Sequence, residues 1–457
     1  MIKSFFLVFI TALCFLSLPT AAALADTAEL ETAIANAQTS ADTGFMLMCS
    51  ALVLLMTPGL AFFYGGFVAR RNILNTLMMS FLLMGVVGVS WVIWGYSLSF
   101  APGLPFIGSL KWAFLSGVGV ETTGYLEGSL PEEVVSYAGT IPHQAFMIYQ
   151  AMFAIITPAL ISGALVERMS FKAYTLFVVL WSTLVYCPIA HMVWAKGGFL
   201  GLYGGIGALD FAGGTVVHIV SGASALVLAI VVGPRTNRVS PPHNVPFILI
   251  GAGLLWFGWF GFNAGSALSS GSLATIAFVS TNTAAASAMM TWLLFEYVLK
   301  GKPTAVGAAT GAVAGLVGIT PAAGFVSPVS AILIGSITSI CCFYAISLKH
   351  KLGVDDALDT FPVHGVGGTV GALLTGVFAS TAVNEFGKDG LIAGNPSQLL
   401  IQLIAVVIAY ALAIVGTLVI ISIVKVITPL RPSPEVETQG MDIEDHGEEG
   451  YGRDFAA

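Results

Sequence analysis

Two histidines are the residues best able to do chemistry in this sequence. His218 and His364 each lie inside a long apolar run, and small residues follow each of them. An ionisable side chain is costly to bury in such a run, so its presence there usually indicates a function. Imidazole titrates near neutral pH, so the pair could accept and pass on a proton. The alternative is that each ring only hydrogen-bonds a neighbouring helix.

A carboxylate precedes the first histidine. Asp210 lies eight residues before His218, in the string Asp-Phe-Ala-Gly-Gly-Thr, which is favourable for the start of a helix. We therefore expect Asp210 to cap that helix, and we interpret Asp359 in the same way before His364. A helical rise of 1.5 Å per residue places His218 about 12 Å below Asp210. His364 would lie about 10 Å from the opposite surface, so both rings approach the middle of a hydrocarbon core about 30 Å thick.

Aromatic residues are the other candidates for binding. An aromatic cluster beside a hydroxyl can stabilise a small cation that sheds its water, through cation–π contacts and hydrogen bonding. Membrane-interface belts and ordinary packing are the plainer explanation of such residues. The candidates are Phe153, Trp194, Trp259, Phe262 and the hydroxyl of Ser266.

Several classes of function are excluded by what the sequence lacks. The net charge is −7, and no basic cluster is longer than Arg70-Arg71, which excludes nucleic-acid binding. No His-Glu-x-x-His or comparable ligand spacing occurs, so we expect no metal and no cofactor. We interpret the cysteines as small apolar residues. A membrane enzyme is disfavoured because no nucleophile or metal constellation is present.

The elements that must position these residues are membrane helices. Of 457 residues, 56% are hydrophobic and only 9% are charged, whereas soluble domains carry about 25% charged residues. We predict an all-α membrane protein with eleven transmembrane helices, because apolar runs of about 20 residues recur along the chain. The predicted spans are residues 44–69, 75–98, 141–165, 173–194, 211–233, 245–267, 274–298, 304–324, 327–348, 358–379 and 397–427.

The N-terminus resembles a secretory leader. Residues 1–25 combine Lys3, an apolar run and Ala23-Leu24-Ala25, so we predict a cleaved signal peptide. An uncleaved first helix is the alternative. Residues 26–43 would then form a periplasmic segment, residues 44–431 the transmembrane domain and residues 432–457 an acidic cytoplasmic tail.

The basic residues predict the orientation. Twelve of them fall at every second junction between spans, and only Lys111, Lys196 and Lys388 fall at the others. Positive residues gather on the cytoplasmic side, so the N-terminus is predicted outside and the C-terminus inside. The twelve are Arg70, Arg71, Arg168, Lys172, Arg235, Arg238, Lys300, Lys302, Lys349, Lys351, Lys425 and Arg431.

The two halves share features. Spans 1 and 6 are both rich in glycine, and spans 5 and 10 each carry one histidine followed by small residues. Five spans followed by five reverse the orientation, so we predict an inverted 5+5 repeat, plus a long final helix, with a site near the membrane midplane.

Five strings in this order make the chain similar to the ammonium transporter (Amt) family, relatives of the Rhesus glycoproteins, over nearly its whole mature length. They are Phe153-Ala-Ile-Ile-Thr-Pro-Ala-Leu-Ile with Gly163-Ala-Leu-Val-Glu-Arg168, Ala190-His-Met-Val-Trp194, Asp210-Phe-Ala-Gly-Gly-Thr-Val-Val-His218, Gly258-Trp-Phe-Gly-Phe-Asn-Ala-Gly-Ser266 and Val363-His-Gly-Val-Gly-Gly368.

The resemblance implies a homotrimer in the inner (plasma) membrane, with one pore per subunit. By position, Trp194, Phe153 and Ser266 resemble the family's external ammonium site, and Phe153 and Phe262 resemble its phenyl gate. His218 and His364 match its twin histidines, and Asp210 matches its aspartate at the pore mouth. Tyr149 stands where some members have Phe, and we expect it to change the polarity of the mouth.

This resemblance predicts a transporter, not an enzyme, that recruits NH4+, deprotonates it and conducts NH3, with a separate proton path along the histidines. Methylammonium is an expected second substrate. A neutral NH3 channel and an ammonium sensor acting through a partner are the alternatives. A PII-type signal protein is the expected cytoplasmic partner, because the tail around Asp442 and His446 resembles the family's C-terminal segment. The plain alternative for the tail is a solvated end.

Overall fold

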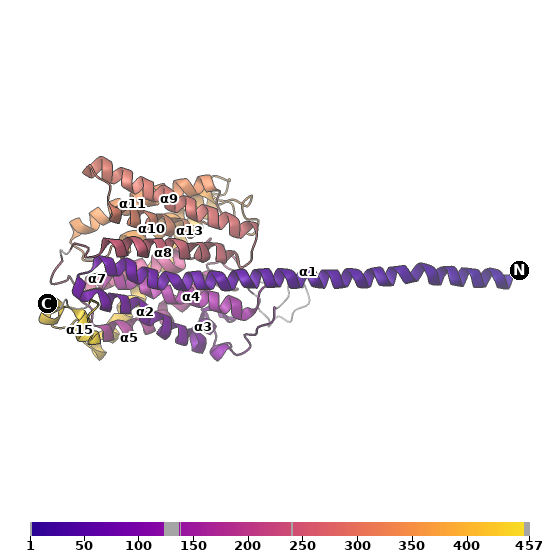
Figure 1. Cartoon of the computed structure of the whole chain (residues 1–457), viewed down its shortest axis with the longest axis horizontal. Helices are drawn as coiled ribbons and strands as arrows, with labels where there is room; N and C mark the ends of the chain where they lie inside the picture. The colour runs from indigo at the N-terminus through magenta and orange to yellow at the C-terminus, as the bar shows by residue number, and fades with distance from the viewer. Residues whose placement is uncertain (1, 123–136, 138, 239–240, 452–457) are drawn as a thin grey trace, which may run out of the picture.

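The molecule is a bundle of long helices that run side by side (Figure 1). The computed structural model describes residues 2–122, 137, 139–238 and 241–451. Within these ranges, ten helical stretches are long and apolar enough to cross a membrane, and Ala305–Ile319 is a shorter apolar helix. These eleven elements overlap the eleven predicted spans, so a multi-pass helical membrane protein is confirmed. The eighth is shorter than predicted, because the chain turns after Ile319.

The α-helices are α1 (Ile2–Phe67), α2 (Ile73–Ser90), α3 (Tyr96–Phe100), α4 (His143–Ile161), α5 (Phe171–Trp181), α6 (Cys187–Trp194), α7 (Val220–Val232), α8 (Val245–Ala264), α9 (Ser272–Lys300), α10 (Ala305–Ile319), α11 (Pro328–Leu352), α12 (Gly367–Phe378), α13 (Ser397–Ile427), α14 (Pro434–Gln439) and α15 (Met441–His446). Two short strands, β1 (Gly103–Leu104) and β2 (Ile107–Gly108), pair antiparallel. Shorter 3₁₀ turns occur at Arg70–Asn72, Ala113–Leu115, Ser162–Ala164 and Gly265–Ala267. Wider π-helical turns occur at Trp91–Gly95, Ser182–Tyr186, Gly214–Ile219 and Phe361–Val366.

Helix α1 projects far beyond the bundle at its N-terminal end (Figure 1). The part of α1 from Thr27 to Phe67 is the first candidate membrane span. The helix is continuous through residues 26–43, where the sequence predicted a separate periplasmic segment. Cleavage of a signal peptide after residue 25 stays a prediction.

Glycines let helices from the two halves of the chain approach closely. A Cβ on Gly258 of α8 would lie 2.6 Å from the carbonyl oxygen of Leu52 on α1, too close for any side chain. In the same way, a Cβ on Gly222 of α7 would collide with the backbone at Gly365. Small residues at such crossings are typical of membrane helices, which lack a hydrophobic drive to associate. The crossing of α7 with the segment before α12 brings the two histidine-bearing segments together.

The tail folds back onto the start of α2. The carboxylate of Asp442 in α15 accepts hydrogen bonds from the backbone N–H of Leu74 at 3.1 Å and of Asn75 at 2.8 Å. Farther on, the hydroxyl of Tyr451 lies 2.9 Å from Nε2 of His243. The described part of the tail is therefore docked against the bundle, and it is not a solvated end.

Candidate functional site

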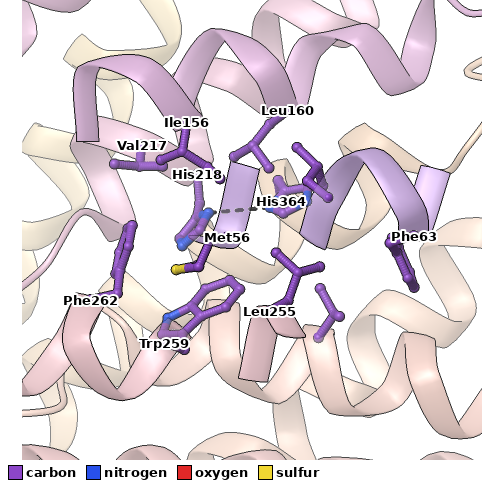
Figure 2. A pocket seen from close by; sticks show the side chains of 12 residues that line it. Met56, Phe63, Ile156, Leu160, Val217, His218, Leu255, Trp259, Phe262 and His364 are labelled. Carbon is purple, nitrogen blue, oxygen red and sulfur yellow. Dashed lines mark hydrogen bonds between the residues drawn. The ribbon is translucent and has the colours of Figure 1, made fainter. Parts of the chain in front are cut away.

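The two predicted histidines meet at the centre of the molecule. Their Nδ1 atoms are 3.2 Å apart, and their rings are nearly parallel, with centroids 5.3 Å apart. Both side chains are buried. Figure 2 shows the two rings facing each other across a narrow space.

Each histidine lies in a π-helical turn that a carboxylate caps. Four backbone N–H groups, those of residues 213–216, donate to the carboxylate of Asp210 over 2.7 to 3.0 Å. This confirms the expected capping role of Asp210. Such wide turns occur often at functional sites, and here they direct both imidazoles toward the interior.

The second cap is not the predicted residue. The carboxylate of Asp356 accepts the backbone N–H of Thr360 at 3.1 Å and of Phe361 at 2.7 Å. The expectation for Asp359 is wrong, because its backbone is left-handed, with φ of 58°, and its carboxylate pairs with Lys349. Asp356 lies eight residues before His364, the same spacing as between Asp210 and His218.

A mostly apolar cavity surrounds the histidine pair (Figure 2). Apart from the imidazoles and the indole of Trp259, its lining is aliphatic, phenyl and thioether. The Nε2 atom of His218 is buried and has no hydrogen-bond partner among the described residues. Such a space holds little that could stabilise a charge other than these rings. The lining residues are Met56, Leu60, Phe63, Ile156, Leu160, Val217, His218, Leu255, Trp259, Phe262, Val313 and His364.

Aromatic rings continue the line from the histidines toward Trp194. The centroids of Phe262 and His218 are 6.2 Å apart, and the centroids of Phe262 and Phe153 are 4.3 Å apart. The ring of Phe153 meets Trp194 edge-on at 5.8 Å. Both phenyl rings are 1% exposed, whereas Trp194 is partly exposed. The two phenyl rings therefore separate the partly exposed indole from the histidines.

Trp259 and Tyr149 support this line from the side. The indole of Trp259 stacks on His218 at 5.4 Å and donates to the hydroxyl of Thr320 at 2.9 Å. Tyr149 is fully buried, and its hydroxyl lies 2.8 Å from the carbonyl oxygen of Phe262 and 3.2 Å from Oγ of Ser266. Its hydroxyl is thus held inside the bundle, which gives no support to the expected effect on the polarity of the mouth.

Hydrogen bonds to two backbone carbonyls hold Trp194 and Ser266, the two residues predicted at the pore mouth. The indole N–H of Trp194 donates to the backbone carbonyl of Asp210 at 2.9 Å, and the hydroxyl of Ser266 donates to that of Phe262 at 2.9 Å. The structure therefore links all nine predicted residues through direct contacts. Among the residues it describes, no group of three His, Cys, Asp or Glu side chains could hold a metal ion.

An ionic cluster forms around Asp355, the residue just before the Asp356 cap of the turn that carries His364. The carboxylate of Asp355 pairs with Arg168 at 3.2 Å and with Arg235 at 2.9 Å, and Arg235 also pairs with Glu167 at 2.7 Å. Burial raises the pKa of the Asp355 carboxyl, but its hydrogen bonds and ion pairs with the two arginines outweigh that effect and hold the pKa below its usual range. The cluster connects the segment between α4 and α5, the segment that follows α7 and the residues before α12.

Sequence reasoning missed Asp356 and two buried glutamines, Gln398 and Gln402. The repeated eight-residue spacing from aspartate to histidine was a usable signal for Asp356. Neither glutamine was predicted, because an amide in an apolar run carries no charge and so gives no signal of the kind that pointed to the histidines. Two amides four residues apart in an otherwise apolar helix also need buried partners, and this could have drawn attention to them.

Comparison with known proteins assigns the family. The model of the Ammonium Transporter Family matches residues 44–451. The chain belongs to the ammonium transporter family. It is 51% identical to an ammonium transporter of Bacillus subtilis over 412 residues, covering 90% of this chain and 98% of that protein. It is 46% identical to an ammonium transporter of Aquifex aeolicus, covering 90% and 93% of the two chains.

Solved structures of this family share the fold. The crystal structure of Candida albicans Mep2 superposes with a TM-score of 0.79 at 35% identity and covers 88% of both chains. A structure described as a sensor Amt protein gives a TM-score of 0.77 at 28% identity, covering 90% of this chain and 99% of that one. Family membership and fold therefore rest on nearly full-length matches.

Proposed function

We propose that this protein is an ammonium transporter whose pore follows the line of contacts from Trp194 to His364. The observation that carries the proposal is the pair of buried imidazoles with Nδ1 atoms 3.2 Å apart, reached past two phenyl rings in contact. Relatives named as ammonium transporters match 90% of the chain, which supports the same substrate.

The lining of the cavity favours NH3 as the species that crosses. A charged ion entering a dry, low-dielectric pore faces an idealised solvation cost of order 20 kcal/mol. Loss of a proton costs much less, because an amine with a pKa near that of lysine pays roughly 4 kcal/mol at pH 7. We therefore propose that NH4+ is recruited at the mouth and passes its proton to Nε2 of His218, which has no hydrogen-bond partner among the described residues, so that NH3 crosses the apolar cavity.

The aromatic mouth supplies the cation site of this proposal. Trp194 offers a π face and Ser266 a hydroxyl, which together can replace part of the hydration shell of NH4+. The rings of Phe153 and Phe262 are in contact, with centroids 4.3 Å apart, and would exclude water beyond that point until they move. Methylammonium has the same charge and one added methyl group, so it is the expected second substrate.

We propose that the proton crosses separately along the histidine pair, which makes transport electrogenic. The two imidazoles face each other, and Nε2 of His218 is free to bond a passing molecule. The alternative is a neutral NH3 channel in which the rings only hydrogen-bond the gas.

An ammonium pulse on purified protein in liposomes tests both readings, with ammonium uptake and membrane current recorded together. Uptake with current supports the proposal, and uptake without current supports the neutral channel. If neither uptake nor current rises above that of empty liposomes, the chain does not transport ammonium.

The proposal extends to assembly and regulation. We propose a homotrimer in the plasma membrane with its N-terminus outside, and a PII-type signal protein bound at the end that carries the docked tail. The position of Arg70, Arg235 and Arg431 at that same end supports this orientation. A role as a sensor is the other candidate, and it is favoured by the likeness to a structure described as a sensor Amt protein.

A further inference from the structure

A buried glutamine from the last membrane helix holds the loop that leads into the mouth. Gln402 of α13 is 1% exposed, and its side-chain oxygen accepts the backbone N–H of Leu209 at 2.7 Å. Its amide nitrogen donates to the carbonyls of Leu209 at 2.8 Å and of Ala372 at 3.0 Å. One turn earlier, Gln398 donates to the carbonyl of Gly207 at 3.0 Å.

These bonds act on the residue next to the mouth aspartate. The carbonyl of Leu209 and the N–H of Asp210 share one planar peptide group, so fixing the first also orients the second. The carbonyl of Asp210 in turn receives the indole N–H of Trp194. A continuous path therefore runs from Gln402 by hydrogen bonds to Leu209, through the peptide group to Asp210, and by a hydrogen bond to the indole of Trp194.

We propose that Gln402 is a positioning residue for ammonium recruitment, which fixes Asp210 and so the angle at which Trp194 meets the cation. This inference rests on the proposed function. Leu209 is fully buried, so without Gln402 its N–H and C=O would lack partners and the loop would shift to find them. Helix α13, which lies outside the predicted repeat, would thus set the geometry of the mouth.

The test measures KM and maximal rate of ammonium uptake in liposomes for wild type, Gln402→Met and Gln402→Asn. The first removes the amide, and the second keeps it but shortens its reach. We expect KM to rise roughly fivefold or more in both, with little change in the maximal rate, because the hydrogen bonds lost at Leu209 act on the mouth. If one variant does not fold, the other still decides the question.

Thr417→Val is the matched control. Thr417 is buried on the same helix, and its hydroxyl donates to Ser224 at 2.8 Å, a bond unconnected to Leu209. Its loss should leave KM unchanged. An equal rise in KM for this variant would show that Gln402 matters only for the general stability of α13.

A double-mutant cycle with Trp194→Leu gives the sharper readout. If Gln402 acts through the indole, the double variant has the KM of Trp194→Leu alone, because the indole that Gln402 positions is already absent. Additive effects, or a wild-type KM for Gln402→Met, would overturn the inference. An absence of uptake by wild type would instead refute the proposed function, so the two failures are distinguishable.

Discussion

At the scale of single residues, the histidine pair is the most informative feature. Two Nδ1 atoms can share a hydrogen bond only if one of them carries a hydrogen and the other does not. The observed 3.2 Å contact between His218 and His364 therefore gives the pair a direction, and a proton that enters at one ring and leaves at the other reverses it. This property is what a proton path requires, and ordinary helix packing does not need it.

Trp194 is predicted to discriminate among cations. Trp194→Leu removes a cation–π contact of about 1 to 2 kcal/mol, so KM for ammonium should rise about 5- to 30-fold and discrimination against K+ should fall. Uptake and competition assays in liposomes measure both. Trp94→Leu is the control, because that indole bonds Thr183 away from the line of contacts. Unchanged selectivity in Trp194→Leu would exclude this residue from the cation site.

Residue types and spacing predicted most of the site. The histidines followed from the cost of burying ionisable groups. The aromatic residues were candidates by their chemistry, and the resemblance to a family assigned roles to them. The wrong choice of Asp359 over Asp356 has a physical cause, because both precede the helix and only backbone geometry shows which carboxylate reaches the free N–H groups. Gln402 could not be assigned, because its partners are backbone atoms of residues 209 and 372.

At the scale of elements, the two capped π-helical turns are the features that orient the site. Sequence periodicity predicted α-helices at both places, since a π-helical turn changes the pattern by only one residue. The matched turns, caps and histidines of the two halves support the predicted inverted repeat. The rings meet because the two turns approach closely where Gly222 packs against Gly365.

Asp356 caps the turn that carries His364, and loss of this cap is predicted to reduce ammonium uptake. Asp356→Ala leaves the N–H groups of Thr360 and Phe361 without their acceptor, which should lower stability by about 1 to 2 kcal/mol. The turn that carries His364 should also loosen, so ammonium uptake should fall more than stability does. Thermal unfolding and uptake assays measure the two effects.

Asp389→Ala is the control for this cap. Its carboxylate accepts the N–H and hydroxyl of Thr381 at 2.7 and 2.9 Å in the loop between α12 and α13. The Asp389→Ala variant should lose about as much stability as Asp356→Ala and keep full uptake. Full uptake in Asp356→Ala as well would mean that the cap serves folding alone.

At the scale of the whole molecule, composition predicted a membrane protein, and hydropathy predicted its spans to within a few residues except for the start of the first. The continuous α1 was not predicted, because the leader and the first span are separate apolar runs. The polar residues between them do not indicate that one helix continues through both. The docked tail was left open for a related reason. An acidic segment has too few apolar residues to fold alone, but Asp442 finds its partners at the start of α2.

The tail is predicted to influence transport from a distance. Deletion from Gly440 onward removes the carboxylate that caps α2, so the protein should fold but transport more slowly. Uptake in liposomes and size-exclusion chromatography measure the two properties. Glu444→Gln, a change at an exposed position of α15, should leave transport intact. A deletion variant with full uptake and unaltered PII binding would show that the docked tail has no regulatory role.

The two facing imidazoles are proposed to carry the proton that ammonium leaves behind. The most direct test is the current evoked by an ammonium pulse in liposomes that contain wild type, His218→Ala or His364→Ala at equal protein density. Proton transfer by a positioned side chain is worth on the order of 100-fold or more, so each variant should lose current by about that factor. Wild-type current in both variants would contradict the account.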